Sequence, residues 1–241
     1  MAKTAADENF PVGSWLIARP LRPLVHEFYR FARTADDIAD DPNLSPEAKL
    51  TRLDEMERRA SALSPILRPH ALELLMAFRQ DARSVSMTNW DELMAYCRLS
   101  AAPVGRMLLE LHGEDRGLYA ASDALCAGLQ VINHLQDCGE DARLLGRIYI
   151  PGALLEDLQA KASSLALRLA LAETVASTRL LLEQAQGLRD IKNRRLRAVV
   201  AVIHSLAEAL LQRLSRQDPL AERVRLPTFA KLRAVTRGLL A

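Results

Sequence analysis

The spacing of apolar residues constrains the fold of this chain more than any other feature. Apolar side chains recur at intervals of three and four, as Leu24, Phe28 and Phe31 do, and no useful length of chain alternates between apolar and polar residues. Intervals of three and four match the turn of an α-helix, whereas strict alternation is typical of strands. The sequence therefore predicts an all-α protein.

Capping residues predict where the helices begin. The few Pro and Gly residues, most of which lie between stretches of helical periodicity, predict where the helices end. Ser45, which precedes a proline, and Asn89 are typical helix starts, and Ser122–Asp123 suggests another. Pro103 is expected to bend the helix that begins at Asn89. A single domain over residues 1–241 is expected. The expected helices cover residues 20–41, 46–63, 69–85, 90–112, 124–141, 162–185, 189–216 and 227–239, with residues 146–151 extended.

Composition excludes several classes of protein. With 49% apolar and 26% charged residues the chain is expected to be globular, and its net charge of +2 favours no nucleic-acid partner. The three cysteines form no CxxC pair, which indicates reduced thiols and a cytoplasmic protein. The N-terminus is too polar for a signal peptide, and no apolar run is long enough to span a bilayer.

Four aspartates lie within six residues at the end of the first expected helix. Asp36 and Asp40 are one turn apart on one face, with Asp37 and Asp41 beside them and Arg33 one turn earlier. Such like-charged pairs destabilise a helix by about 0.2–0.5 kcal/mol each, and the helix dipole disfavours anions at this end. Either the helix end is simply solvated, or the carboxylates bind divalent cations.

A second polar row lies about a hundred residues later. Gln130, Asn133, Asp137 and Asp141 follow one another by single turns, opposite an apolar face. Such a row on an interior helix needs partners, which could be a hydrogen-bonded structural network or a metal ion with a polyanion. If the two helices face each other, the aspartates converge on one cavity suited to Mg²⁺ and a diphosphate. The sequence contains no phosphate-binding P-loop, dinucleotide fingerprint, Glu-x-x-His or GxSxG motif.

Charge is distributed unevenly along the chain. Residues 179–241 hold 13 Lys and Arg against 5 Asp and Glu, whereas the preceding residues are net acidic. This basic part could be a solvated helix surface, or it could attract anionic lipid or an anionic substrate.

These motifs resemble those of the squalene/phytoene synthase family over most of the chain, from about Glu8 to Leu226. The resemblance implies an isoprenoid-synthase-type helical bundle around a central cavity, and an enzyme that acts on isoprenoid diphosphates with Mg²⁺. The segments that carry it are Phe28–Asp41, Tyr96–Arg106, Leu129–Asp141 and Gly146–Pro151.

Three further segments, Glu8–Ser14, Ala77–Ala82 and Val202–Ala207, are most similar to a bacterial branch of this family that serves hopanoid biosynthesis. That likeness implies a lyase that ionises presqualene diphosphate and captures the cation with water, giving hydroxysqualene. Two alternatives remain open. A head-to-head prenyltransferase making presqualene diphosphate or phytoene would use the same aspartates, and a shortened chain could be a non-catalytic partner of pathway enzymes.

The resemblance also implies roles for individual residues. Arg33, Gln130 and Arg147 would hold phosphate oxygens, with Asn133 assisting the metal. Tyr29 and Tyr96 would border the ionising carbon. The expected metal ligands are Asp36, Asp40, Asp137 and Asp141, and the expected lining of an apolar tunnel for the isoprenoid tails is Ala101, Val104 and Gly105.

The chain departs from the family pattern in two places. Family members carry more residues, typically a helix, where 63–69 connects the second and third helices here, and residues 158–163 also look shortened. Losing a helix would expose apolar surface on its neighbours, at a cost of about 25 cal/mol per Å². Because the implied product is a water-insoluble C30 lipid, we also expect peripheral membrane contact through the basic C-terminal helices.

Overall fold

The computed structural model describes residues 17–84 and 86–240, and every regular element in this part of the chain is helical, which confirms the all-α prediction. The segment Glu8–Ser14 lies outside the described residues. The α-helices are α1 (Arg22–Asp40), α2 (Pro46–Arg59), α3 (Arg68–Ala82), α4 (Trp90–Ser100), α5 (Ala102–Leu111), α6 (Tyr119–Glu140), α7 (Leu155–Gln159), α8 (Leu165–Gln184), α9 (Arg194–Leu214) and α10 (Thr228–Leu240). Short 3₁₀ turns are η1 (Arg19–Leu21), η2 (Ala60–Ala62), η3 (Arg116–Leu118) and η5 (Ala185–Asp190), and η4 (Asp141–Leu145) is a π-helical turn.

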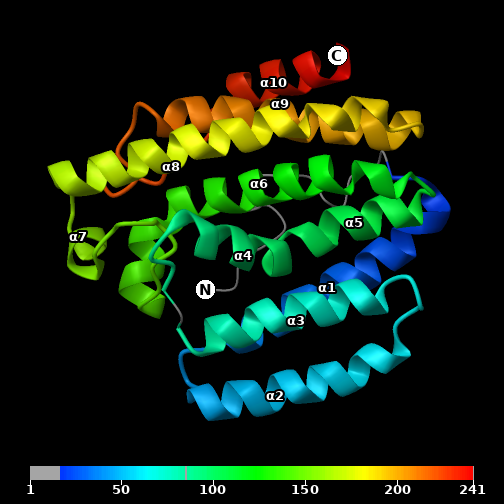
Figure 1. The fold of residues 1–241 in the computed structure, drawn as a ribbon, viewed down its shortest axis with the longest axis horizontal. Coiled ribbons are helices and arrows are strands. Elements are labelled where there is room, and N and C mark those ends of the chain that lie inside the picture. The colour runs from blue at the N-terminus through cyan, green and yellow to red at the C-terminus, as the bar shows by residue number, and fades with distance from the viewer. Residues whose placement is uncertain (1–16, 85, 241) are drawn as a thin grey trace.

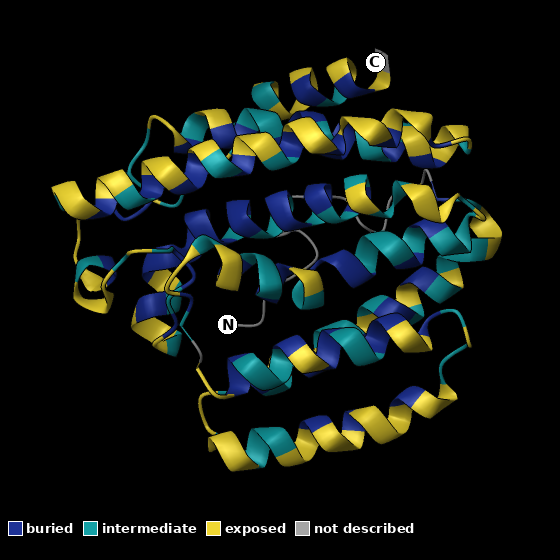
Figure 2. Ribbon diagram, viewed as in Figure 1, coloured by how far each residue is buried: buried dark blue, intermediate teal, exposed yellow. Residues whose placement is uncertain are grey.

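Helix α6 lies in the middle of the bundle (Figure 1), where α4, α5, α8 and α9 pack against it. Helices α1, α2 and α3 form a layer on one side of this centre, and α10 lies on the other side, packed on α9. Figure 2 shows α6 buried along much of its length, whereas α2 exposes its outer face. No helix in the described ranges is long and apolar enough to cross a membrane.

Two apolar clusters hold the helices together. The smaller joins α1, α2, α3 and α5 around Phe28, Leu53 and Leu74, and the larger surrounds α6 with residues of α4, α8 and α9. The predicted apolar face of α1 is confirmed, since Phe28 and Phe31 are buried. Helix α1 therefore packs within the smaller cluster, whereas α6 lies at the centre of the larger one.

The capping predictions hold at two helix starts. The Ser45 hydroxyl accepts a hydrogen bond from the Ala48 backbone N–H at 3.3 Å at the start of α2. The Asn89 side chain accepts one from the Glu92 backbone N–H at 2.9 Å at the start of α4. Both side chains satisfy backbone donors that the first helical turn leaves without partners.

The expected bent helix over residues 90–112 is wrong in detail. The helix is interrupted at Ala101, so that α4 and α5 are separate helices. Pro103 lies in the first turn of α5, where a backbone N–H would have no partner within the helix and its absence costs no hydrogen bond. The expected start of α6 after Ser122–Asp123 is also wrong, because the helix begins at Tyr119. Asp123 instead forms a two-point ion pair with Arg106 on α5, at 2.9 Å for the first contact.

Other helix boundaries differ from the predictions, and two elements were not predicted at all. Helix α9 begins at Arg194 rather than 189, after the 3₁₀ turn η5, and Asn193 caps it. The short helix α7 and the π-helical turn η4 have no counterpart among the expected helices. Gly146, at φ 63°, ends η4 in a left-handed conformation that favours glycine. The segment 146–151 lies outside any helix, as predicted, but it is not extended throughout, because Gly146 is left-handed and a turn begins at Pro151.

Candidate active site

The two acidic rows face one cavity of ≈ 390 Å³. Asp36 and Asp40 approach it from α1, and Asp137 and Asp141 approach it from the last turns of α6 and the start of η4. The one-turn spacing puts both members of each pair on the same helix face. Those faces of α1 and α6 lie on opposite sides of the cavity. We call this hollow the polar cavity.

The first row carries more negative charge than its arginines neutralise. Arg33 donates to Asp36 at 3.0 Å and also pairs with the exposed Asp37 at 3.0 Å. Burial and the adjacent Asp40 raise the pKa of Asp36 to about 7, and Arg33 offsets this increase in part. A carboxylate in this setting gains from any cation that enters the cavity.

Arg147 links the segment after η4 to the end of α1. Its guanidinium donates to Asp40 at 2.6 Å and to the Ala39 carbonyl at 3.0 Å. Burial alone would lower the pKa of Arg147, but nearby Tyr149 and the carboxylates of Asp81 and Asp40 outweigh that effect and raise it, so the guanidinium stays charged. Its buried Nε has no hydrogen-bond partner.

Asp137 of the second row is neutralised by an arginine from a distant part of the sequence. Arg223, in the loop between α9 and α10, contacts both carboxylate oxygens of Asp137, at 2.7 and 3.0 Å. His134 Nδ1 lies 3.9 Å from Asp141, and His134 Nε2 lies 3.2 Å from the side-chain nitrogen of Gln130. The Nη2 contact of Arg223 is a hydrogen bond, and its Nε contact is an ion pair without hydrogen-bond geometry.

Asp81 anchors two tyrosines at the wall of the polar cavity. The Tyr96 hydroxyl donates to one oxygen of Asp81 at 2.9 Å, and the Tyr149 hydroxyl donates to the other at 2.6 Å. Burial raises the pKa of both tyrosines well above 10 and also raises the pKa of Asp81. The His134 ring stacks on Tyr149 with centroids 3.9 Å apart. Both phenols are therefore protonated and held in fixed orientations.

An apolar cavity of ≈ 210 Å³ adjoins the polar one between α5, α6 and α9. Val104, Gln130 and Asn133 line both cavities. At Gly105 the two helices α5 and α6 come close, since a Cβ on this residue would lie 2.3 Å from the Ser122 hydroxyl. A ligand with a polar head and an apolar tail would therefore have room for both parts.

Most of the predicted site residues lie together, although not all of them line the same hollow. Ala101 and Gly105 line the apolar cavity rather than the polar one, and Arg33 lines neither but reaches Asp36. Asp37 is exposed, and Asp41 accepts a hydrogen bond from the Asn43 backbone at 2.9 Å. The predicted residues that line the polar cavity are Tyr29, Asp36, Asp40, Tyr96, Val104, Gln130, Asn133, Asp137, Asp141 and Arg147.

Four polar lining residues received no role from the sequence, namely Asp81, His134, Tyr149 and Arg223. The first three fall within segments that carried the resemblance. The sequence therefore indicated the region of the site, but not the contacts that these three side chains make. Arg223 stands among many arginines of the C-terminal part, and nothing in its local sequence sets it apart.

The carboxylate oxygens of the two rows are the donor type that Mg²⁺ takes in proteins. Within residues 17–84 and 86–240, however, no three His, Cys, Asp or Glu side chains gather closely enough to hold a metal ion by themselves. The donor set therefore fits an ion that completes its shell with ligand oxygens and water.

The fold and the cavity define a bundle of the isoprenoid-synthase type. Its architecture matches a solved squalene synthase from Alicyclobacillus acidocaldarius with a TM-score of 0.74 and 31% identity, over 86% of this chain and 87% of that one. The squalene/phytoene synthase family model matches residues 3–65 and 58–230. The chain belongs to the squalene/phytoene synthase family.

Its sequence relatives point to one branch of that family. The hydroxysqualene synthase of Rhodopseudomonas palustris is 45% identical over 248 residues, which cover 93% of this chain and 85% of that protein. The hydroxysqualene synthase of Zymomonas mobilis is 44% identical over 244 residues, which cover 90% of this chain and 82% of that protein. These relationships identify the chain as an enzyme of isoprenoid biosynthesis.

Proposed function

We propose that the chain converts presqualene diphosphate and water into hydroxysqualene and diphosphate, as a Mg²⁺-dependent carbon–oxygen lyase. The observation that carries this proposal is the polar cavity, where two acidic rows face each other beside an apolar cavity. The identity to hydroxysqualene synthases favours this reaction over other members of the family.

The first row supports the proposed metal. Asp36 has its pKa raised to about 7 by burial and by Asp40, so an added cation would relieve a repulsion that the chain itself leaves in place. Asp36, Asp40, Asp137 and Asp141 would hold Mg²⁺ together with substrate oxygens. Bound Mg²⁺ neutralises the charge that develops on the diphosphate as it leaves.

The arginines would complete the diphosphate site. Arg147 is buried and charged, and its Nε lacks a partner, which suits it to a phosphate oxygen at the base of the cavity. Arg33 and Arg223 pair with aspartates of the two rows, one at each side. Gln130 and Asn133, where the cavities join, would orient the substrate between its diphosphate and its apolar tails.

The tyrosine pair and Asp81 fit a cavity that must contain a carbocation. A neutral phenol is a weaker nucleophile than a phenolate, and Tyr96 and Tyr149, whose pKa burial raises, would stay neutral beside the cation. Asp81 fixes the direction of the two hydroxyl groups. The apolar cavity would hold the isoprenoid tails and exclude bulk water, so that a single water captures the cation.

Product analysis tests this proposal. The protein would be incubated with Mg²⁺ and either presqualene diphosphate or farnesyl diphosphate, and the products identified by gas chromatography. Hydroxysqualene from presqualene diphosphate is the expected result. Consumption of farnesyl diphosphate alone would identify a head-to-head prenyltransferase, and folded protein that consumes neither would be a non-catalytic partner of pathway enzymes.

A further inference from the structure

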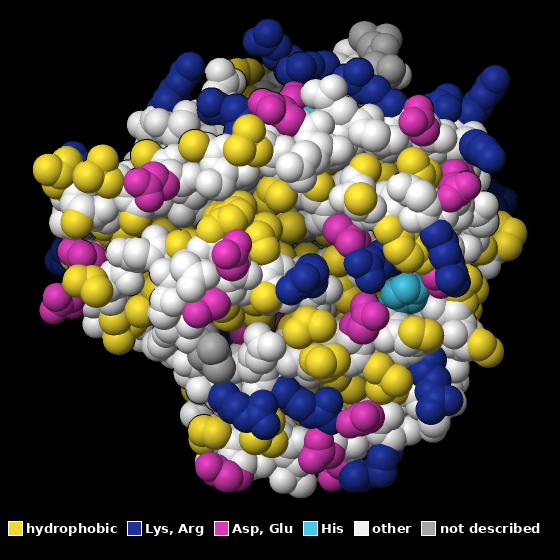
Figure 3. All heavy atoms as spheres, viewed as in Figure 1, with side chains coloured by type: hydrophobic (Ala, Val, Ile, Leu, Met, Phe, Trp, Pro, Cys, Tyr) yellow, Lys and Arg dark blue, Asp and Glu magenta, His cyan; other side chains and the backbone are white. Residues whose placement is uncertain are grey.

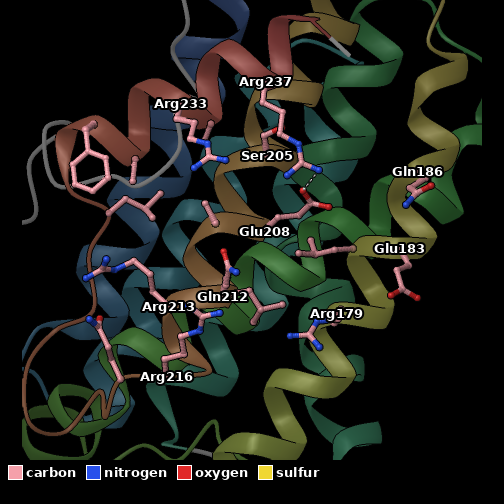
Figure 4. A pocket seen from close by; sticks show the side chains of 18 residues that line it. Arg179, Glu183, Gln186, Ser205, Glu208, Gln212, Arg213, Arg216, Arg233 and Arg237 are labelled. Atoms are coloured by element: carbon pink, nitrogen blue, oxygen red, sulfur yellow. Dashed lines mark ion pairs between the residues drawn. The ribbon is translucent and has the colours of Figure 1, made fainter.

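A groove rich in arginine lies on the far side of the molecule from α2, between α8, α9 and α10. It has a volume of ≈ 970 Å³. Figure 4 shows its arginines coming from three directions around one hollow. We call it the arginine groove, and its basic residues are Arg179, Arg213, Arg216, Arg233 and Arg237.

The positive charge of this groove is largely unneutralised. Glu183 and Glu208 are its acidic lining residues, and Arg237 pairs with Glu208 at 3.3 Å. The other four arginines form no ion pair with any carboxylate in the described part of the chain. The Nε of Arg213 is buried and has no hydrogen-bond partner. The groove therefore presents excess cationic donors to solvent.

Helix α10 adds an exposed apolar face beside these charges. Phe229, Leu232 and Leu239 are 75%, 68% and 53% exposed, and their spacing puts them on one side of the helix. Phe229 also lines the arginine groove, while Arg233 and Arg237 border the apolar face. Figure 3 shows Lys and Arg side chains gathered along the edge of the molecule that carries α10.

The opposite side of α10 is fixed to the bundle. Ala234 is buried, and a Cβ on Gly238 would lie 2.5 Å from Cα of Val202 on α9. This close contact holds α10 in a defined orientation, with its apolar face turned away from the core. A helix that presents apolar side chains flanked by basic ones is typical of a segment that lies in the surface of a membrane.

We propose that α10 and the arginine groove dock the protein on an anionic lipid bilayer. Phe229, Leu232 and Leu239 would enter the boundary between headgroups and acyl chains, and the groove arginines would bind lipid phosphates. Charge complementarity and the adjoining apolar residues together favour a bilayer over an acidic protein, since the surface potential of anionic lipid attracts each nearby basic residue.

The docking surface lies close to the apolar cavity, which matters for the release of product if the proposed function is correct. Val200 and Ile203 of α9 line the apolar cavity, and Gly238 of α10 contacts Val202 between them. Only α9 therefore separates the docking helix from the cavity proposed to hold the isoprenoid tails. A water-insoluble product would form close to the bilayer that must receive it.

Sedimentation with lipid vesicles tests the docking surface without reference to activity. Wild-type protein is expected to bind phosphatidylcholine vesicles that contain phosphatidylglycerol, and to bind pure phosphatidylcholine weakly. The triple variant Arg179→Gln, Arg216→Gln, Arg233→Gln should lose at least about tenfold in binding at low salt. The double variant Phe229→Ser, Leu232→Ser should lose binding at both low and high salt, because burial of apolar side chains is not screened.

Matched controls come from the opposite face of the molecule. Arg52, Arg58 and Arg59 are exposed on α2, and their triple change to Gln removes the same charge without touching the groove. Met76→Ser, at an exposed position of α3, is the control for the apolar change. Both should bind vesicles as the wild type does, and circular dichroism should show all variants folded.

Two results would overturn the proposal. If the wild type fails to sediment with anionic vesicles at low salt, the surface does not bind membranes; binding of a polyglutamate peptide in the same buffer would then assign the groove to an acidic protein partner. If the α2 control loses as much binding as the groove variant, the attraction comes from overall charge and not from this surface.

Discussion

The two acidic rows share a one-turn spacing but differ in their surroundings. In the first row the side chains of Asp36 and Asp40 are 38% and 40% exposed, and in the second those of Asp137 and Asp141 are 8% and 17% exposed. Asp137 has Arg223 bound to both of its oxygens, whereas Asp36 shares Arg33 with Asp37.

This difference shows that spacing alone does not set the state of a carboxylate. A row buried within the bundle needs a counter-charge from the chain, because an uncompensated buried charge is costly. In the first row, burial and the adjacent Asp40 raise the pKa of Asp36, and Arg33 offsets that increase only in part. We therefore regard the first row as the side that gains most from an added cation.

Changing one aspartate in each row should have the largest effect. Asp36→Asn and Asp137→Asn should each lower the turnover of presqualene diphosphate by about 10²- to 10³-fold, since each removes a fixed charge that supports departure of the diphosphate. Steady-state assays with Mg²⁺ measure this loss. Asp37→Asn is the control, because Asp37 is exposed and does not line the cavity. If only one of the two variants loses turnover, the two rows do not act together on the substrate.

Removing the arginine partner of each row should lower the free energy of unfolding by different amounts. Arg223→Gln leaves the buried Asp137 without its two-point partner and should lower the free energy of unfolding by about 2–3 kcal/mol. Arg33→Gln breaks contacts that are partly open to solvent and should cost less than about 1 kcal/mol. Urea unfolding at neutral pH measures both values. Equal losses would mean that burial does not distinguish the two rows.

Asp36→Asn should stabilise the folded protein even though it removes activity. The folded-state pKa of Asp36 lies near 7, above the ordinary value of 3.8, so the charged form is disfavoured in the fold. The resulting penalty is absent below about pH 4, grows between about pH 4 and about pH 7, and is constant above that. Because the side chain is more than a third exposed, we expect a gain of about 1 kcal/mol at pH 8 without divalent ions. Urea unfolding at pH 8 and pH 4 checks this, and an equal change at both would contradict it.

The smallest effect should be that of Mg²⁺ alone. Since the described residues gather no set of three ligating side chains, Mg²⁺ without diphosphate should stabilise the protein by less than about 0.5 kcal/mol. Mg²⁺ with inorganic diphosphate at about ten times its dissociation constant should add about 1.4 kcal/mol. Thermal unfolding distinguishes the two cases, and the added stability should disappear in Asp36→Asn and Asp137→Asn. A large shift with Mg²⁺ alone would show that the rows form a complete metal site.

The sequence predicted the parts of this protein that depend on neighbouring residues. The apolar face of α1, the caps at Ser45 and Asn89 and the pairing of Asp36 with Asp40 all follow from contacts within one or two helical turns. The errors arose where tertiary contacts compete with local signals. Asp123 suggested a helix cap, but Arg106 of α5 binds it and α6 begins earlier at Tyr119.

By itself the sequence determined the helical class of the chain, the spacing of its acidic rows and the motifs that mark its family. Tertiary structure alone decided that Arg223 neutralises Asp137, that Asp81 holds two tyrosines, and that the arginines of α8, α9 and α10 gather beside an exposed apolar face. The physical reason is the separation along the sequence over which local contacts act. A helical turn couples residues three or four apart, whereas Arg223 and Asp137 are separated by 86 positions and meet only when the helices pack.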